Sequence, residues 1–188
     1  MYNPNSFSFE AGIQMAVSQP TSWLSSSEVQ YRTANLRDLR RLSALSRECF
    51  GKDSWPLIDF LLVLVLPGTI RHLALDKNEL IGFVIADRRR GMQMGWIASI
   101  AVHPAYQRQG IGQGLLKLCE QALAMPRVRL TLRPSNQAAK SLYGSAGYEQ
   151  VDTWQAYYHD GEDGMVMEKK MPVQGIESED GLPGIAVE

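Results

Sequence analysis

Three glycines, Gly110, Gly112 and Gly114, stand at the start of an amphipathic helical pattern in the stretch VHPAYQRQGIGQGLL (102–116). Each glycine inside a helix costs roughly 1 kcal/mol relative to alanine. The first turn of a helix presents unpaired N–H groups and a partial positive charge, which together bind phosphate. Glycine lets the backbone approach such an anion without a Cβ atom in the way. The stretch is therefore a candidate phosphate-binding site, with tight helix–sheet packing as the alternative explanation.

Two common nucleotide-binding motifs do not fit these glycines. The dinucleotide fingerprint G-x-G-x-x-G requires glycine at position 115, which is Leu115, and it follows its strand without a loop such as 104–109. The P-loop requires Gly-Lys-Ser/Thr five residues after Gly110, where Leu115 and Leu116 stand. What fits is Gln107-x-x-Gly110-x-Gly112, placed between a strand that ends in Val-His-Pro and an amphipathic helix.

The elements that position this loop follow from hydrophobic periodicity and from the turn residues. Asn35 is expected to cap the first helix, and Gly147 is expected to follow the last one. The order of elements predicts an α/β (α+β) fold, with a mixed, mostly antiparallel sheet flanked by about four helices. Strands are expected at 28–34, 69–76, 79–88, 92–103, 127–133, 148–158 and 164–171, and helices at 36–50, 55–66, 110–124 and 136–146.

Length and composition indicate one folded domain with two tails. The chain has 188 residues, of which 45% are hydrophobic, and the domain is expected at 28–171. An N-terminal extension (1–27) and an acidic tail (172–188) are expected to be disordered. A net charge of −1 provides no field for nucleic acid, and the run Arg88–Arg90 is interpreted as a solvated hairpin turn. The apolar run 57–67 is too short to cross a membrane, so neither nucleic acid nor membrane is expected as a partner.

The two cysteines, Cys49 and Cys119, lie in helical patterns among apolar neighbours. They have no CxxC partner and no histidine at a metal-ligand spacing, so neither a metal site nor a disulfide framework is expected. The first 27 residues also lack the pattern of a signal peptide. Buried, reduced thiols favour a cytoplasmic protein.

The loop with its flanking strand and helix resembles the acetyl-CoA pyrophosphate loop of the GCN5-related N-acetyltransferase (GNAT) family. The resemblance runs from about 30 to 171 and includes RPSNQAAKSLYGSAGY (133–148), which is similar to the family's Asn…LYxxxGF/Y helix. With CFGKDSWP (49–56) and YYHDGEDGMVM (157–167), the chain is most similar to the ribosomal-protein-alanine N-acetyltransferase branch, which acetylates protein N-terminal amines. The resemblance implies a V-shaped split in the sheet that holds acetyl-CoA.

The same resemblance implies a role for individual residues. The phenol of Tyr143 would protonate the departing thiolate, although its spacing also suits a core aromatic. Asn136 would touch the cofactor, and it is also a candidate N-cap, which is a compatible role. The strand backbone at 100–102 would pair with pantetheine, and the loop 108–113 would cradle the pyrophosphate. The cofactor-binding residues so implied are Ile100, Ala101, Val102, Arg108, Gln109, Gly110, Ile111, Gly112, Gln113 and Asn136.

A carboxylate of the N-terminal branch is missing here. In that branch the strand before the Asn helix carries a glutamate base in a Leu-Glu-Val-Arg setting, whereas this chain has Thr131 in Leu-Thr-Leu-Arg. Threonine cannot act as a base near neutral pH. Glu162, Asp163 and His159 in the last hairpin loop are the alternative bases.

Two further residues have open roles at this stage. His103 is expected to close a strand rather than to act in catalysis, because the residue before proline is held extended. Trp55 either packs in the core or borders the acceptor site.

Two hypotheses of different kinds follow. The first is an active acetyl-CoA-dependent N-acetyltransferase, acting on a protein N-terminal α-amine or on a small-molecule amine. The second is an acetyl-CoA-binding module without turnover. The absent glutamate favours the second, while Tyr143 and the intact loop favour the first. The sequence does not predict an oligomeric state.

Overall fold

The computed structural model describes residues 29–172 of the chain, so the predicted extension and, apart from Pro172, the predicted tail lie outside the described residues. Seven strands form one sheet in the order β1-β2-β3-β4-β5-β7-β6, in which β4 and β5 are parallel and every other described pair is antiparallel. The predicted fold class is confirmed. The elements are β1 (Gln30–Thr33), α1 (Leu39–Phe50), α2 (Leu57–Val65), β2 (Thr69–Asp76), β3 (Glu79–Arg89), β4 (Met94–Val102), α3 (Ile111–Leu123), β5 (Arg127–Leu132), α4 (Gln137–Ser145), β6 (Glu149–Trp154) and β7 (Gly164–Lys170).

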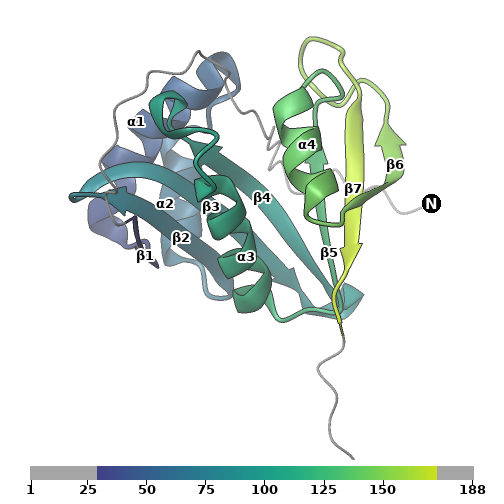
Figure 1. Ribbon diagram of the computed structural model, residues 1–188, viewed down its shortest axis with the longest axis horizontal. Helices are drawn as coiled ribbons and strands as arrows, with labels where there is room; N and C mark the ends of the chain where they lie inside the picture. The colour runs from purple at the N-terminus through teal and green to yellow at the C-terminus, as the bar shows by residue number, and fades with distance from the viewer. Residues whose placement is uncertain (1–28, 173–188) are drawn as a thin grey trace, which may run out of the picture.

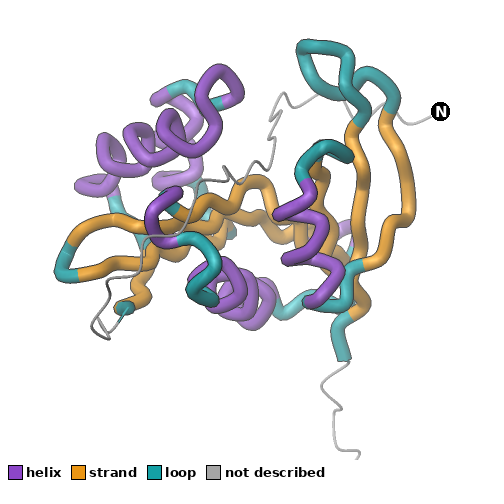
Figure 2. Tube along the Cα trace, turned by 45° about the horizontal axis from the view of Figure 1, so that its top comes forward, coloured by secondary structure: helices purple, strands orange, loops and turns teal. Residues whose placement is uncertain are grey.

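The helices cover opposite faces of the sheet (Figures 1 and 2). On one face, α3 and α4 bury Leu115, Leu123 and Tyr143 against the central strands. On the other face, α1 and α2 bury Leu42 and Phe60, among others, against β2, β3 and the end of β4. Between residues 29 and 172, no helix is both long and apolar enough to cross a membrane.

Local capping signals set the helix ends. Asn35 Oδ1 accepts a hydrogen bond from Arg37 N, and Asp38 Oδ2 accepts one from Asn35 N. Together these bonds form a capping box. The first turn, η2 (Leu36–Asp38), is a 3-10 turn that runs into α1. Gly147 has φ +88° after α4, a conformation that favours glycine. These two predicted boundary residues are confirmed.

The arginine run 88–90 is only partly a turn, so its interpretation as a solvated hairpin was wrong for two residues. Arg88 lies in β3, and its Nε donates to the carbonyl of Leu123 at the C-terminus of α3 (3.0 Å). A cation is favourable there because the last carbonyls of a helix carry partial negative charge. Arg89 stacks 4.4 Å from the ring centroid of Trp96. Arg90 alone starts the turn η4 (Arg90–Met92).

Candidate functional site

The sheet opens between the parallel strands β4 and β5. These strands pair at three positions, the last of which joins Ile97 to Leu130. Beyond that pair, β4 continues to Val102 and β5 to Leu132, and these described segments do not pair with each other. Figure 1 shows the two strands meeting at the bottom of the view and diverging toward the top. The V-shaped split implied by the resemblance is confirmed, and it leaves one edge of β4 without a partner strand.

A β-bulge at Ala98 lies where the split begins. Ile97 pairs with Ala86 of β3, and Ser99 pairs with Ile85, so Ala98 has no partner residue on β3. A bulge bends its strand and increases the local twist, which turns β4 away from β5. The bulge therefore gives the split a physical cause, and no periodicity in the stretch 92–103 predicts it.

The unpaired edge of β4 presents the backbone of Ile100 and Val102. His103 donates its N–H to Ile81 O on the β3 side. Since backbone groups of an antiparallel strand alternate between its two edges, Ala101 also faces β3, while Ile100 and Val102 face the split. The side chains of these three residues are buried. A ligand in the split would therefore meet backbone groups of Ile100 and Val102, whereas the backbone of Ala101 is directed to the neighbouring strand.

The loop after β4 is folded back onto the end of that strand. The Gln107 side chain donates to Val102 O (3.1 Å), and His103 Nδ1 accepts from Ala105 N (3.2 Å) at the start of η5 (Pro104–Tyr106). Arg108 is exposed and has φ +63°, which few non-glycine residues adopt. The loop thereby leads from the free edge of β4 to the N-terminus of α3.

The three glycines at the start of α3 serve three different purposes. Gly110 has φ +80° and is the N-cap residue. A Cβ atom on Gly114 would lie 2.4 Å from Tyr31 Oη, so this glycine allows close packing against β1. The packing explanation is therefore correct for Gly114. Gly112 is a buried, regular residue of the first turn, and its role of letting an anion approach the free N–H groups stays a prediction.

Asn136 is the N-cap of α4, as its sequence position suggested. Its Oδ1 accepts from Ala139 N (3.0 Å). The side chain is thereby fixed at the start of the helix that carries Tyr143. Contact of Asn136 with the cofactor stays a prediction.

Tyr143 lies fully buried on α4. Its ring meets that of Tyr148 edge-on at 5.5 Å between centroids. Burial raises the pKa of Tyr143 well above its ordinary value, and the nearby Cys119 and Tyr158 contribute in the same direction. The phenol is therefore protonated at neutral pH, so it can donate a proton and cannot serve as a base.

Several buried polar side-chain atoms have no hydrogen-bond partner in the described part of the chain. Within residues 29–172, the side-chain atoms of this kind are Tyr143 Oη, Thr131 Oγ1, Tyr158 Oη, Arg133 Nε and Asp76 Oδ1. More than nine in ten buried polar groups in native proteins are hydrogen-bonded. The first four come from the end of β5, from α4 and from the β6–β7 loop. Such a set of atoms fits a site that is completed by a polar substrate.

Thr131 lies on the opposite face of β5 from the two helices α3 and α4. Its neighbours Leu130 and Leu132 pack against those helices, and side chains alternate along a strand. Thr131 is 2% exposed, and a Cβ atom on Gly164 would lie 2.8 Å from its Cγ2. The position expected to carry a carboxylate is thus a small, buried site on the α1–α2 side of the sheet.

Glu162, one of the three alternative bases in the β6–β7 loop, is poorly suited to that role. Glu162 accepts from Arg133 (2.8 Å) and from Ser135 N (2.9 Å). Burial acts to raise the pKa of Glu162, but these hydrogen bonds outweigh it and lower the pKa overall. Asp163 accepts from Ala156 N (2.9 Å), and His159 is exposed. A carboxylate held by cations and N–H groups is a weak base.

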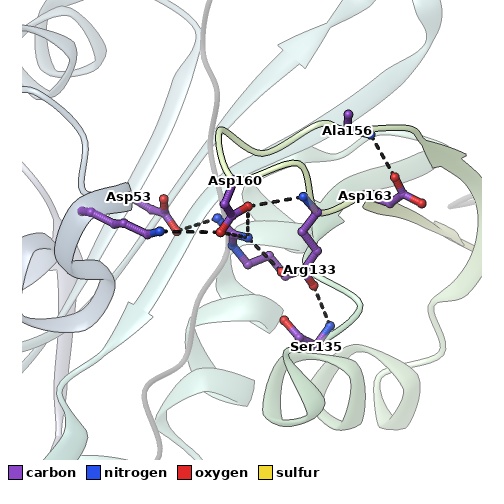
Figure 3. Close-up of polar contacts among 8 residues, drawn as sticks. Asp53, Arg133, Ser135, Ala156, Asp160 and Asp163 are labelled. Carbon is purple, nitrogen blue, oxygen red and sulfur yellow. Dashed lines mark hydrogen bonds and ion pairs between the residues drawn. The ribbon is translucent and has the colours of Figure 1, made fainter.

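Arg133 is the residue that sequence reasoning missed. Its guanidinium donates to Asp53 (2.9 Å) after α1, and to Asp160 (2.9 Å) and Glu162 (2.8 Å) in the β6–β7 loop. The same group stacks 3.8 Å from the ring centroid of Tyr158. Figure 3 shows the carboxylates of Asp53 and Asp160 lying beside Arg133. The acidic run 160–163 was visible in the sequence, but its partner Arg133 lies 27 residues from Asp160 and 29 from Glu162 along the chain.

The side chains of His103 and Trp55 are both held by contacts within the protein. Both ring nitrogens of His103 are engaged, because Nε2 lies 2.9 Å from Glu48 Oε1 and Nδ1 accepts from Ala105 N. Trp55 is buried against Phe60, with 5.4 Å between ring centroids. Trp55 therefore packs in the core beneath α2.

Comparisons with known proteins identify the family. The family model described as Acetyltransferase (GNAT) family matches residues 36–148. The chain is 32% identical over 124 residues to "N-alpha-acetyltransferase RimI" of Mycobacterium tuberculosis, covering 64% of this chain and 78% of that protein. It is 28% identical to an "N-alpha-acetyltransferase" of Sulfurisphaera tokodaii, covering 74% of this chain and 92% of the relative.

The fold is shared with solved structures. The ribosomal-protein-S18-alanine N-acetyltransferase of Escherichia coli superposes with a TM-score of 0.71 at 24% identity, covering 80% of this chain and 98% of that one. The chain belongs to the Acetyltransferase (GNAT) family. The acetyl-CoA-dependent acetyltransferase reaction that the resemblance implied is confirmed with the family.

Proposed function

We propose that this protein transfers the acetyl group of acetyl-CoA to the N-terminal α-amine of a protein or peptide. The observation that carries the proposal is the split between β4 and β5, which leaves the end of β4 with a free strand edge between the two layers of helices. The names of the two sequence relatives support an α-amine as acceptor. Two reduced cysteines, both buried, support a cytoplasmic site of action.

In this proposal the chain binds the donor through backbone groups. The free edge at Ile100 and Val102 would hold the pantetheine arm, and the first turn of α3, from Gly110 to Gln113, would hold the pyrophosphate. These groups orient the thioester so that its carbonyl meets the split. A backbone N–H of the β4 edge would polarise that carbonyl as negative charge develops on its oxygen.

Tyr143 would supply the proton for the departing thiolate. Attack by the neutral amine forms the new C–N bond, and the C–S bond then breaks with its electron pair on sulfur, which takes the phenol proton. The attacking nitrogen releases its extra proton to solvent water, and the phenol of Tyr143 is reprotonated from water. The buried phenol has no partner among the described residues and remains protonated at neutral pH. It is therefore available as a general acid.

The absence of a carboxylate at position 131 shapes the acceptor preference. An α-amine with a pKa of about 7.8 is about one part in seven neutral at pH 7, whereas a lysine with a pKa of about 10.4 is about one part in 2,500 neutral. An enzyme without a dedicated base would therefore act far better on an α-amine. A small-molecule amine of low pKa, which is also partly neutral at pH 7, is the alternative acceptor by the same reasoning.

We expect a peptide with one free α-amine and one lysine to be acetylated predominantly at the α-amine. The rate is expected to rise steeply between pH 7 and pH 9, because the neutral fraction of the amine increases with pH. Mass spectrometry of the products at several pH values measures both effects. Predominant acetylation of the lysine would contradict the preference.

Thr131→Glu is expected to restore a base at the buried position beside Gly164. Relative to Thr131→Gln, which has the same size and no carboxylate, we expect kcat/KM at pH 7 to be at least about tenfold higher, because general base catalysis contributes at least that much. The gain is expected to fade above pH 8, where neutral amine is abundant. Initial rates of the two variants across this pH range measure the difference, and equal rates at pH 7 would be evidence against it.

A second candidate function is binding of acetyl-CoA without turnover. The observation that favours it is the buried Thr131 in place of a base. Release of free thiol from acetyl-CoA in the presence of a pool of peptides and amines separates the two functions. Thiol release that depends on the acceptor supports the enzyme, and binding of acetyl-CoA without release supports the module.

A further inference from the structure

Two segments far apart in the sequence border the open end of the split on the α1–α2 side. One is the turn η3 (Gly51–Asp53) between α1 and α2, and the other is the loop 155–163 between β6 and β7. Arg133 is the residue that follows β5, and it lies between them. Figure 3 shows the two segments approaching each other through their acidic side chains.

Arg133 makes contacts to both segments at once. One guanidinium nitrogen, Nη2, donates to Asp53 Oδ2 (2.9 Å). The other, Nη1, donates to Asp160 Oδ1 (2.9 Å) and to Glu162 Oε2 (2.8 Å). The Arg133 side chain is only 5% exposed. Glu162 extends the network to the start of the α4 segment by accepting from Ser135 N (2.9 Å).

Both the charge and the shape of the arginine side chain suit this position among three carboxylates better than those of lysine. Burial alone would lower the pKa of Arg133, but hydrogen bonds to Asp160, Glu162 and Asp53 outweigh it and raise that pKa. The hydrogen bond from Arg133 lowers the pKa of Asp160 to about 2, so this carboxylate remains ionised at neutral pH. A planar guanidinium can donate in several fixed directions, whereas a lysine ammonium is a compact point charge.

The loop 155–163 depends on these polar contacts for its order. Most of its residues are exposed, and Tyr158 is the one fully buried member. Its ring lies under the Arg133 guanidinium, while its hydroxyl is one of the buried atoms without a partner in the described part of the chain. A loop with few buried apolar contacts opens easily. Two polar links join it to η3: the buried Arg133, and the ion pair between Lys52 Nζ and Asp160 Oδ2 (3.6 Å), whose lysine side chain is 77% exposed. Exposed ion pairs contribute little to stability, so the position of the loop relative to η3 is set mainly by Arg133.

We propose that Arg133 is a positioning residue for the acceptor: it fixes the β6–β7 loop to the α1–α2 turn. The two segments then form one ordered wall, that is, a continuous protein surface beside which the amine enters the split. The inference rests on the proposed function, because it concerns the acceptor amine of that reaction. Arg133 acts through the two segments, and it lies on the face of β5 opposite to the helices that hold the donor.

The test compares Arg133→Lys with Arg129→Lys. Arg129 lies four residues earlier, within β5 and on the same face of the sheet, and it pairs with Glu168 of β7, away from both segments. The probe is a short peptide with a free α-amine and no lysine. For Arg133→Lys we expect the KM for the peptide to rise about tenfold or more, with kcat within about threefold and the acetyl-CoA Kd within about twofold of the wild type. Arg129→Lys is expected to leave all three constants near their wild-type values.

Hydrogen exchange of the same proteins gives a readout that needs no turnover. Amides of 155–163 are expected to exchange faster in Arg133→Lys than in Arg129→Lys, with α3 unchanged. Asp160→Asn is a second variant. It alters an exposed carboxylate, so we expect the fold to be retained. We expect it to raise the KM for the peptide by a smaller factor, about threefold, because it weakens the contacts of Asp160 with Arg133 and Lys52 while Asp53 and Glu162 keep theirs with Arg133.

The outcomes separate the two proposals. An unchanged peptide KM in Arg133→Lys, or a parallel loss of kcat and acetyl-CoA affinity, would overturn the positioning role while leaving the proposed function in place. A wild-type protein that binds acetyl-CoA but acetylates no peptide would overturn the proposed function, and with it the acceptor role of Arg133.

Discussion

Tyr143→Phe is expected to lower kcat about 100-fold or more, within the range typical of general acid–base catalysis. The KM for acetyl-CoA should change little, because the ring still packs on α4 against Tyr148. The stability of the free protein is expected to stay equal or to rise, since the lost hydroxyl is buried and has no partner among residues 29–172. Loss of activity without loss of stability would distinguish a proton donor from a core residue.

Tyr148→Phe is the matched control for this variant. Tyr148 is the neighbouring buried tyrosine, and its hydroxyl differs from that of Tyr143 because it has a partner, donating to Glu120 (3.0 Å) on α3. We expect it to lower the melting temperature by a few degrees, through the loss of a hydrogen bond to a charged group, and to leave kcat unchanged. Steady-state kinetics and thermal unfolding of both variants measure the contrast. Wild-type kcat in Tyr143→Phe would show that the thiolate leaves without this donor.

Gly112→Val is expected to weaken acetyl-CoA binding by an order of magnitude or more, which corresponds to at least about 1.4 kcal/mol. The branched side chain would stand at the first turn of α3, where the proposed pyrophosphate site uses free N–H groups. Calorimetric titration with acetyl-CoA measures the Kd. Because Gly112 is buried, unfolding of the variant is measured alongside binding.

Gly114→Ala provides the opposite pattern in the same helix. Its Cβ atom would displace the partly exposed end of the Tyr31 ring, while alanine favours the helix by about 1 kcal/mol, so we expect a small change in stability and an unchanged Kd for acetyl-CoA. An unchanged acetyl-CoA Kd in Gly112→Val would contradict the pyrophosphate-loop assignment. Weakened acetyl-CoA binding in Gly114→Ala, but not in Gly112→Val, would show that the ligand approaches the helix at Gly114 rather than at Gly112.

The sequence by itself determined the elements and the family. Local signals were sufficient for these, because a capping asparagine such as Asn35, a C′ glycine such as Gly147 and an alternating strand act through neighbours in the chain. The pattern from Gln107 to Gly112 located the loop between β4 and α3 for the same reason. The missing carboxylate at Thr131 was also visible in the sequence.

Only the tertiary structure decided how these parts make a site. The bulge at Ala98 depends on register with β3, and the backbone direction of Ile100 and Val102 follows from it. The role of Gly114 became clear from a ring of β1, more than eighty residues earlier. Arg133 gathered carboxylates from two distant segments, which removed Glu162 as a free base. Such contacts join residues that are remote in the chain, and their energies depend on burial and distance, which no local pattern encodes.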